Sequence, residues 1–347
     1  MKKVVVIGGG FCGSLVAKEL EKDFDLTLID AKDYFEFTPS VLRTIVDPEH
    51  LNKIQVKHSD YLKKAKVIIG CVEKIEGEYV YLKNEKIRFD YLVVASGSSY
   101  SFPIKEKNLV IASRGLNLKK CHESLKKSKD VLIIGGGLVG LELVAEIREF
   151  FPNKKIKMVH SSEELIGRQN KKTIDYAHNF LEKSNIEVLF NEKVIKSSKG
   201  VYETNKNRKI KTDMAFLCTG IKTNSDFLKN NFADKLNNKK QLMVNNFLQV
   251  SERKNIFAGG DVTSTNEEKT AQNAEKHAKK IIQNIRNLEK GKKLKRYEPK
   301  KRMMVISLGK NDGILSYGNF MIGGFIPAMF KRFIEWKSME KYKNGIK

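Results

Sequence analysis

The same order of apolar and polar segments occurs twice along the chain. Residues 4–7 and 131–134 are short aliphatic runs, which predict buried strands, the first of them over 3–7. Each run leads into a glycine-rich turn and then into a helix-like stretch, over 11–22 in the first case and from residue 138 in the second. The chain therefore repeats one strand–turn–helix unit.

Both turns have the pattern G-x-G-x-x-G, and their first glycines are 127 residues apart. In this pattern the first glycine permits a tight turn, the second lets the backbone approach a pyrophosphate, and the third lets the helix pack on the strand. The pyrophosphate then rests on unpaired N–H groups at the positive end of the helix. One such turn can be purely structural, but two predict two bound dinucleotides, as in a flavoprotein that receives electrons from a nicotinamide cofactor. The candidate contacts are Gly8, Gly10, Phe11, Cys12 and Gly13 in the first turn and Gly135, Gly137, Leu138, Val139 and Gly140 in the second.

The strand predicted over 25–30 ends in Asp30, which lies 22 residues after the first fingerprint glycine. This spacing suits a carboxylate that binds an adenosine ribose, although aspartate is also common in the turn after a strand. In the second unit the corresponding strand, 156–160, ends in His160 instead. This strand end has no carboxylate that would bind the 2′-hydroxyl of NADH and reject the 2′-phosphate of NADPH. The choice between NADH and NADPH therefore stays open.

Small residues follow several further predicted strands. Residues 66–95 predict a β-rich stretch that includes Val72 and closes at Ala95, Ser96 and Gly97; the segment 216–220 closes similarly, at Gly220. Small residues and glycine let the chain pass close to a bound cofactor.

Strands are also expected over 244–250 and 255–261, followed by a helix over about 269–289. The second of these strands ends in Gly260 and Asp261. Asp261 has two compatible roles, as a contact to the ribityl chain of a flavin and as a cap of the helix. The positive end of that helix would stabilise negative charge on a reduced flavin.

The composition and charge narrow the class of protein. A chain of 347 residues with 41% hydrophobic residues supports more than one domain. The net charge of +24 is uneven, since residues 276–347 hold 19 Lys/Arg against 5 Asp/Glu, a net +14. Such a region attracts anionic lipid or nucleic acid, although lysines also simply solvate a surface. We expect no secretory signal and no transmembrane helix, because no run of 18 apolar residues occurs.

The four cysteines and six histidines are scattered, without a C-x-x-C or C-x-x-x-x-C pattern. We therefore expect no local redox disulfide and no metal site. Cys12 lies at a helix start, where the pKa of a thiol can fall, but a small residue tolerated in a crowded turn is the preferred interpretation.

Together, the two fingerprints, the turns at 95–97 and 218–220 and the ending at 260–261 resemble the two-dinucleotide flavoprotein superfamily. The segment Phe35-Glu-Phe-Thr-Pro39 resembles the F-x-P segment beside the isoalloxazine in type II NADH:quinone dehydrogenases, and 270–276 resembles their A-Q segment. Lys276 replaces the second glutamine of their A-Q-x-x-x-Q pattern. A further likeness is to the ferroptosis suppressor and apoptosis-inducing-factor-like branch, through the segments 30–33, 159–161, 218–225, 308–313 and 336–339.

The resemblance implies an FAD-dependent NAD(P)H:quinone oxidoreductase that does not pump protons. Hydride would pass from NADH or NADPH to the flavin, and two electrons would then pass to a membrane quinone. Glu142 would orient the nicotinamide, Gln272 and Glu275 would border the quinone or assist its protonation, and Lys331 would lie near its entrance. The cofactor contacts that the resemblance adds are Ala31, Lys32, Pro39, Thr270 and Ala271.

Residues 318–347 predict a membrane-associating segment with apolar residues close to helical spacing, in which we expect Pro327 to begin the main helix. Lys331, Arg332, Glu335 and Lys337 lie between the apolar positions of this amphipathic helix. Such a helix lies in a bilayer interface, or else packs on the protein's own core or in a homodimer. Together with the charge, it favours a peripheral (monotopic) protein on the anionic, cytoplasmic side of the cell membrane. The apolar positions are Ile322, Phe325, Ile326, Met329, Phe330, Phe333, Ile334 and Trp336.

The expected fold is α/β, with two Rossmann-like dinucleotide-binding domains and a C-terminal amphipathic helical membrane-binding segment. The expected boundaries are 1–105 and 239–300 for the two parts of the FAD-binding domain, 106–238 for the NAD(P)H-binding domain and 301–347 for the membrane-associating region. Two other functions stay open: a soluble reductase of a ferredoxin-like carrier, and an apoptosis-inducing-factor-like redox protein that binds nucleic acid. No nucleic-acid motif supports the latter, so no nucleic acid is expected as a partner. The missing C-x-x-x-x-C near residues 35–50 excludes the disulfide reductase branch.

Overall fold

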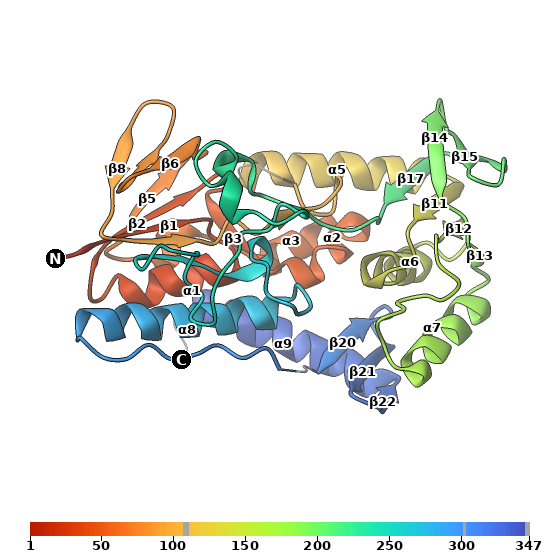
Figure 1. Ribbon diagram of the computed structural model, residues 1–347. Coiled ribbons are helices and arrows are strands. Elements are labelled where there is room, and N and C mark those ends of the chain that lie inside the picture. Colours follow the sequence, from red (N-terminus) through yellow and green to blue (C-terminus); the bar gives the residue numbers. More distant parts are fainter. Residues whose placement is uncertain (107–110, 301–302, 344–347) are drawn as a thin grey trace.

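Two parallel sheets lie toward opposite ends of the molecule, and each contains one fingerprint strand (Figure 1). The computed structural model describes residues 1–106, 111–300 and 303–343. The start of the second predicted domain (107–110), two cations of the basic region (301–302) and the end of the predicted tail (344–347) lie outside the described residues. The predicted α/β class is confirmed.

The first sheet has five parallel strands in the order β19-β9-β1-β2-β5. In β1, Val4 and Val6 face one hydrophobic cluster while Val5 and Ile7 face another, as the two-residue period of a strand requires. The helices α1 (Phe11–Leu20) and α8 (Ala271–Glu289) pack together on the first face. The strands are β1 (Lys3–Ile7), β2 (Asp25–Asp30), β5 (Lys66–Ile69), β9 (Tyr91–Val94) and β19 (Ile256–Ala258).

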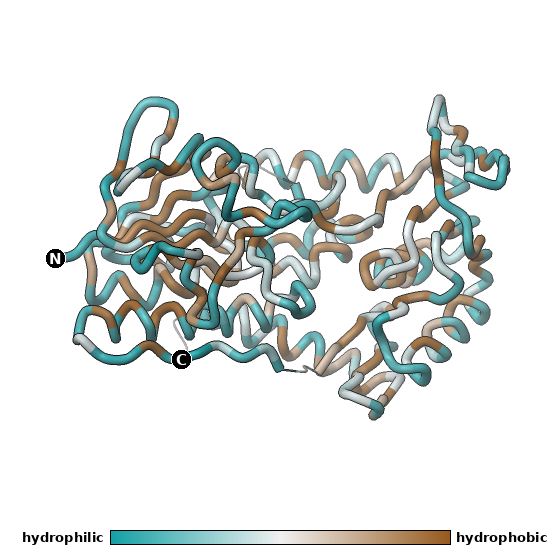
Figure 2. Tube along the Cα trace, in the orientation of Figure 1, coloured by the Kyte–Doolittle hydropathy of each residue, from teal (hydrophilic) through white to brown (hydrophobic). Residues whose placement is uncertain are grey.

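A small antiparallel sheet covers the other face of the first sheet, through Ile75 and Val80. Its strands are β6 (Lys74–Glu76), β7 (Tyr79–Tyr81) and β8 (Lys86–Arg88). Figure 2 shows hydrophobic residues concentrated in the strands of the large sheet, with hydrophilic loops at the surface. Both faces of the parallel sheet are therefore buried, which explains the aliphatic runs in its strands.

The second sheet is parallel and has the order β13-β12-β11-β17. Its strands are β11 (Asp130–Ile134), β12 (Lys155–Val159), β13 (Glu187–Leu189) and β17 (Met214–Leu217). The accompanying helices are α5 (Ile111–Lys127), α6 (Leu138–Phe150) and α7 (Lys171–Lys183). A three-stranded antiparallel meander follows, with β14 (Val194–Ser198), β15 (Val201–Thr204) and β16 (Lys209–Lys211).

Short elements link the two sheets. β10 (Ser98–Ser99), in the segment that leaves the first unit after β9, pairs with β18 (Lys222–Thr223), in the segment that returns to it after β17. The segment after β2 forms β3 (Tyr34–Glu36), η1 (Thr38–Ser40), α2 (Arg43–Val46), η2 (Pro48–His50), α3 (Leu51–Ile54), β4 (Gln55–Lys57) and α4 (His58–Tyr61). Three further 3-10 turns are η3 (Asp226–Leu228), η4 (Ala233–Lys235) and η5 (Gly260–Val262).

The C-terminal unit is a three-stranded antiparallel sheet followed by one helix. It contains β20 (Met304–Ser307), β21 (Gly313–Tyr317), β22 (Phe320–Gly323) and α9 (Phe325–Lys343). α9 begins two residues before Pro327, where the main helix was expected to begin. Ile322, expected at a helical position, lies in β22 instead, because a hairpin with Gly318 at φ +58 precedes the helix. Within the described residues, no helix has the length and hydropathy to span a bilayer.

The strand predicted over 244–250 is also wrong. Val244 and Val250 form only an isolated bridge across a tight turn. The side-chain oxygen of Asn245 accepts the backbone N–H groups of Phe247 and Gln249, at 2.8 and 3.0 Å, and Leu248 has a φ of +64. An asparagine that caps its own turn competes with the extended conformation that aliphatic residues favour. The first helix also ends two residues earlier than predicted, at Leu20.

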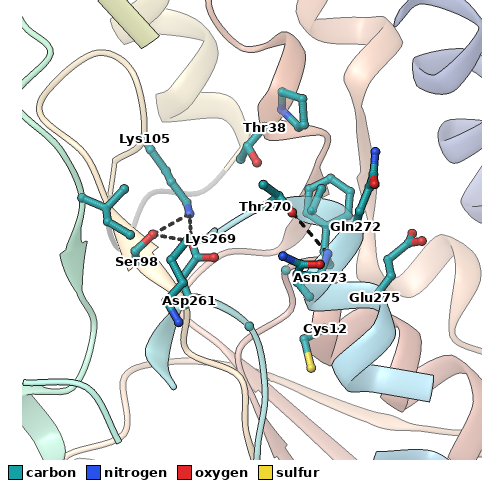
Figure 3. Close-up of a pocket in the computed structure, with 18 of the residues that line it drawn as sticks. Cys12, Thr38, Ser98, Lys105, Asp261, Lys269, Thr270, Gln272, Asn273 and Glu275 are labelled. Carbon is teal, nitrogen blue, oxygen red and sulfur yellow. Dashed lines mark hydrogen bonds and ion pairs between the residues drawn. The ribbon is translucent and has the colours of Figure 1, made fainter. Parts of the chain in front are cut away.

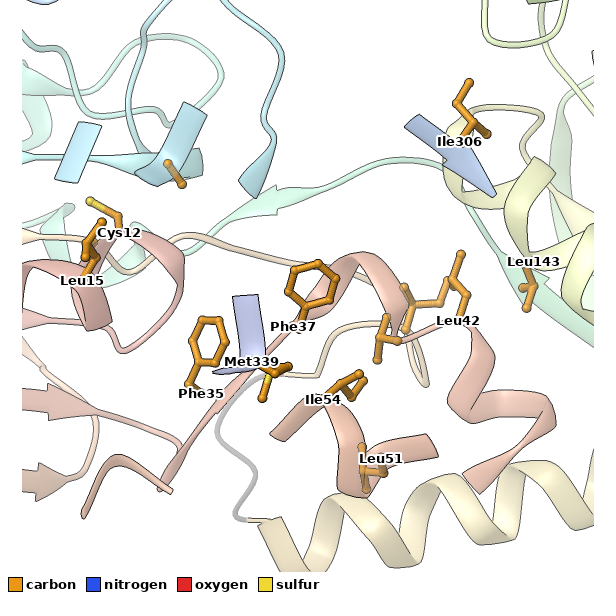
Figure 4. Close-up of a cluster of buried hydrophobic side chains, with 14 of the residues drawn as sticks. Cys12, Leu15, Phe35, Phe37, Leu42, Leu51, Ile54, Leu143, Ile306 and Met339 are labelled. Carbon is orange, nitrogen blue, oxygen red and sulfur yellow. The ribbon is translucent and has the colours of Figure 1, made fainter. Parts of the chain in front are cut away.

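One continuous hydrophobic cluster joins all three units (Figure 4). It includes Cys12 and Phe35 of the first unit, Leu143 of α6, and Ile306 and Met339 of the C-terminal unit. The C-terminal helix is thus partly a core element of the protein.

Three glutamates along one side of α6 add polar contacts between the units. Glu142 accepts the backbone N–H of Ser307 at 2.8 Å, and Glu149 accepts that of Lys310. Between them, Glu146 forms a bidentate ion pair with Arg43 of α2, at 2.9 and 3.0 Å. Spacings of four and three residues place these carboxylates on one helix face, so α6 binds both the first unit and the C-terminal unit.

Replacing Arg43 alone by methionine should lower the free energy of unfolding by about 3 kcal/mol, because Glu146 would keep a buried, uncompensated charge. The double variant Arg43→Met/Glu146→Leu should recover most of that loss. Urea denaturation of both variants and of Glu146→Leu measures this coupling. Additive single and double effects would contradict it.

Candidate functional site

A cavity of about 1130 Å³ opens at the carboxyl ends of the strands of the first sheet. Its wall also includes the first turns of α1, α6 and α8 and residues from β20 and α9. Ligands of open parallel sheets bind at such an edge because the loops and helix N-termini converge there. The geometry therefore makes this cavity the candidate site.

The first fingerprint turn leaves space at one glycine and none at the other two. A Cβ on Gly8, whose φ is +97, would lie 2.4 Å from Ala95 O, and one on Gly13 would lie 1.7 Å from Gly8 O. A Cβ on Gly10 would meet nothing within 4 Å. The outer glycines allow the chain to pack closely, and Gly10 leaves an open cradle at the N-terminus of α1.

Most of the predicted site residues line this cavity. From the first unit these are Gly8, Gly10, Phe11, Cys12, Asp30, Ala31, Lys32, Pro39, Val72, Ala95, Ser96, Gly97, Gly260, Asp261, Thr270, Ala271, Gln272 and Glu275; from the second unit they are Leu138, Val139 and Glu142. Six predicted residues lie outside its lining: Gly13, Gly135, Gly137, Gly140, His160 and Gly220. Cys12 is buried, and burial raises the pKa of its thiol, so it is no activated nucleophile.

Asp30 takes part in a chain of buried hydrogen bonds that the sequence did not reveal. Its carboxylate lies 2.9 Å from Nε2 of His58, and Nδ1 of that ring lies 2.7 Å from the Tyr61 hydroxyl. Tyr61 donates to Ser14 Oγ, which donates to the backbone oxygen of Gly9. This network fixes the acid at the cavity wall and the fingerprint turn relative to each other.

Asp261 lies beside a cation and a hydroxyl, as Figure 3 shows. Ser98 Oγ donates to its carboxylate at 2.6 Å, and Lys105 Nζ lies 3.4 Å from the same oxygen. Burial opposes ionisation of Asp261, but Lys105 and the Ser98 hydrogen bond more than offset this and lower its pKa. The ionised carboxylate is an acceptor for ligand hydroxyls.

The turn before Asp261 is positioned by His277 of α8. Nδ1 of this buried ring accepts the Gly260 backbone N–H at 2.9 Å, so the proton must be on Nε2, which lies 2.6 Å from Glu267. Glu267 also accepts the Tyr297 hydroxyl. The only sequence signal was a histidine seven residues into a helix whose first turn lines the cavity.

The second fingerprint turn has the same geometry as the first. A Cβ on Gly135 or Gly140 would lie 2.4 Å from Cys218 O or 1.9 Å from Gly135 O, whereas one on Gly137 would meet nothing within 4 Å. Nδ1 of His160 accepts the Gly136 N–H at 3.1 Å, and burial lowers the pKa of the ring. Since Nε2 of His160 lies 3.0 Å from Glu164 O, both ring nitrogens have protein partners.

The three predicted catalytic residues lie on different parts of the cavity wall. Glu142 is held by Ser307 N and by an ion pair with Lys331 of α9. Glu275 lies 3.5 Å from Lys341, and the exposed Gln272 donates to Met303 O at 3.4 Å. Gln272 and Glu275 belong to the same first turns of α8 (Figure 3).

Two Rossmann-like sheets and a shared cavity with these carboxylates define a two-dinucleotide oxidoreductase fold. The chain belongs to the pyridine nucleotide-disulphide oxidoreductase family, which it matches over residues 2–278. As a member of this family, it is an oxidoreductase that uses FAD and NAD(P)H.

Similar proteins extend the match beyond residue 278. Apoptosis-inducing factor homolog B of Dictyostelium discoideum is 34% identical, with 95% of this chain and 93% of that protein aligned. Ferroptosis suppressor protein 1 of Xenopus tropicalis is 31% identical over 97% and 96%. Two solved structures share the fold: a sulfide:quinone oxidoreductase from Aquifex aeolicus (21% identity, TM-score 0.83, covering 99% of this chain and 92% of that one) and NDH2 from Plasmodium falciparum in complex with NADH (18%, 0.78, 99% of each).

The residues around the cavity fit FAD. Gly10 offers the open cradle for a pyrophosphate, and Asp30 and Asp261 offer ionisable acceptors at two places on the wall. Within the described residues, Glu36 Oε2 and Asn224 Oδ1 are buried in this wall and have no hydrogen-bond partner, as expected of groups that await a polar ligand.

The variant Gly10→Ala should fold but bind FAD at least about tenfold more weakly, because its methyl group would occupy the cradle. Gly13→Ala should lose about 3 kcal/mol of stability, since its methyl group would overlap Gly8 O. Flavin absorbance and thermal unfolding separate the two effects. Equal flavin content in Gly10→Ala and the unsubstituted protein would refute the role of the cradle.

Proposed function

We propose that the protein is an NAD(P)H:quinone oxidoreductase that acts as a peripheral protein at the cytoplasmic face of the cell membrane. The observation that carries this proposal is that three different parts of the protein line one cavity. Leu138 and Val139 come from the second fingerprint, Gln272 from the FAD side, and Met304 and Ile306 from the C-terminal sheet. An apolar wall beside the redox site suits the ring of a quinone.

The names of similar proteins support this substrate class. One protein of the same fold is named a sulfide:quinone oxidoreductase. For this chain we assign residues 1–105 and 239–300 to FAD binding, 106–238 to NAD(P)H binding and 301–347 to the membrane-associating region.

In this proposal the chain mainly binds and orients. When bound, FAD supplies two-electron chemistry between NAD(P)H and the quinone. Glu142 orients the nicotinamide, while Gln272 and Glu275 border the quinone. Pro39, Thr270 and Ala271 shape the cavity around the ring system.

Membrane attachment is supported by the outer face of α9. Ile326, Met329, Phe333 and Trp336 follow one another at helical spacing and are between 47% and 63% exposed. Phe325 and, on the adjoining hairpin, Tyr317 and Phe320 are also exposed, while Arg332 and Lys337 add cations. Aromatic and basic residues together favour the interface of an anionic bilayer.

The alternatives have less support. A ferredoxin-like carrier would need a mainly charged docking surface, whereas the exposed part of α9 carries the large apolar side chains of Ile326, Met329, Phe333 and Trp336. Nucleic-acid binding would rest on the basic region alone. A homodimer through α9 would cover the same residues as a membrane, and the vesicle experiment below separates the two.

Anaerobic stopped-flow absorbance tests the redox proposal. NADH or NADPH should bleach the flavin, and a short-chain ubiquinone or menaquinone analogue should restore its absorbance. Gln272→Ala should slow the quinone step about tenfold and leave the bleaching unchanged, because its contact is to the acceptor only. The control is Lys279→Ala, an exposed position on the same helix. Equal loss of both steps would contradict the role of Gln272, and no recovery with any quinone would contradict the function.

Flotation with phosphatidylglycerol-containing vesicles tests membrane attachment. Phe333→Glu/Trp336→Glu should remove most binding, because two charges would enter the interface. Leu116→Glu, at a 61% exposed apolar position on α5, should bind normally. If the double variant floats like the unsubstituted protein, the apolar face is not the membrane anchor. If the unsubstituted protein is a dimer in vesicle-free buffer and the double variant is a monomer that does not float, the face is a subunit interface.

A further inference from the structure

A second, smaller cavity of about 20 Å³ adjoins the large one. Four residues line both: Pro39, Leu42, Glu142 and Lys331. The volume is enough for one water molecule where polar partners are present. The two cavities are therefore separated by a wall one side chain thick.

Ionisable side chains from four elements line the small cavity. His50 comes from η2, Arg43 from α2, Glu142 and Glu146 from α6, and Lys331, Arg332 and Glu335 from α9. Arg332 is exposed, whereas His50 and Glu335 have side chains that are 7% and 16% exposed. The cluster thus extends from near the surface to the wall of the large cavity.

Six of these seven residues form three pairs. His50 Nε2 lies 3.1 Å from Glu335, Lys331 pairs with Glu142, and Arg43 pairs with Glu146 at 2.9 Å. Glu335 and Lys331 are four residues apart on α9, so their side chains lie on the same face of the helix. Both the His50–Glu335 pair and the Lys331–Glu142 pair line the small cavity, whose volume suits one water molecule, while Arg43 is bound to Glu146.

Burial opposes ionisation of Glu335, but hydrogen bonds from His50 and Ser40 and the nearby Arg43 more than offset this and lower its pKa. The buried carboxylate is therefore ionised beside a histidine. Histidine is the side chain that gains and loses a proton near neutral pH. Packing of α9 against the first unit does not require this ion pair, since two apolar residues would hold the helix at least as well.

The proposed reaction needs one proton from solution. Reduction of a quinone to a quinol by NAD(P)H forms two O–H bonds with two electrons. The hydride of NAD(P)H provides both electrons and the equivalent of one proton, and NAD(P)⁺ leaves. The second proton must come through the protein or directly from water.

We propose that His50 and Glu335 supply this second proton to the large cavity through Lys331. This inference rests on the proposed function and names a proton path for the same site. An N–H bond of Lys331 breaks as the O–H bond of the quinol forms, and the amine regains its proton from His50 and Glu335 across the small cavity. His50 is then reprotonated from solution.

The test compares two acceptors of reduced holoenzyme in stopped flow. A short-chain ubiquinone analogue needs protons, whereas ferricyanide takes single electrons and binds none. His50→Gln and Glu335→Gln should each slow reoxidation by the quinone about 10²-fold at mildly alkaline pH and leave ferricyanide reoxidation unchanged. The ferricyanide rate also shows that each variant is folded and holds its flavin.

The matched controls are His178→Gln, at a ring stacked on Phe190, and Glu187→Gln, in an exposed ion pair with Lys157. Both should keep the quinone rate. If His50→Gln and Glu335→Gln keep it too, the path is refuted and the proposed function stands. If the unsubstituted protein is reoxidised by ferricyanide but by no quinone, both are refuted.

A second readout needs no turnover. The ring resonance of His50, assigned from its loss in His50→Gln, is followed against pH by NMR in the oxidised holoenzyme. Its midpoint should be higher in Lys331→Met than in the unsubstituted protein, because a positive charge on the wall of the same small cavity is removed. If the midpoint is the same in Lys331→Met, the protonation of His50 is not coupled to Lys331, and the proposal is overturned.

Discussion

The packing of α6 is the constraint on which the arrangement of the molecule depends. Its N-terminus is fixed by Gly140 against Gly135, and three glutamates on one side bind α2, β20 and the turn after it. These contacts hold the first sheet, the second sheet and the C-terminal unit around one cavity. The buried ion pair between Arg43 and Glu146 specifies this arrangement more than it stabilises it.

The features that could be predicted from the sequence are those that local residue patterns determine. Aliphatic runs before glycine turns identified β1 and β11, and the small residues after β9 and β19 identified positions on the cavity wall. These patterns are reliable because strand burial and close backbone approach restrict the residue type at each position. The site residues remain predictions in their roles, but the fold brings most of them to one cavity.

Other features depend on partners that are distant in sequence. His58 and His277 became informative only when the fold placed them beside Asp30 and Gly260, and the turn at 244–250 depended on one asparagine side chain. For α9, the apolar pattern left open whether the helix packs on the protein's own core or presents an apolar face outward, and the structure contains apolar residues of both kinds. Met339 and Tyr342 are buried in the core, while Phe333 and Trp336 face outward. A single amphipathic pattern cannot separate the two faces, because both are apolar.

The strand order of the first sheet has a consequence for synthesis of the chain. β19, at residues 256–258, completes a sheet whose other strands end by residue 94, and α1 packs on α8. The second sheet uses only residues 130–217. On the ribosome, the unit that contains the second sheet is therefore complete and able to fold while the first unit still lacks an edge strand and a covering helix. One apolar face of the first sheet therefore stays incompletely covered until α8 has been translated, which ends nearly 200 residues after β9. A chaperone that protects this face would bind the N-terminal part of the chain first.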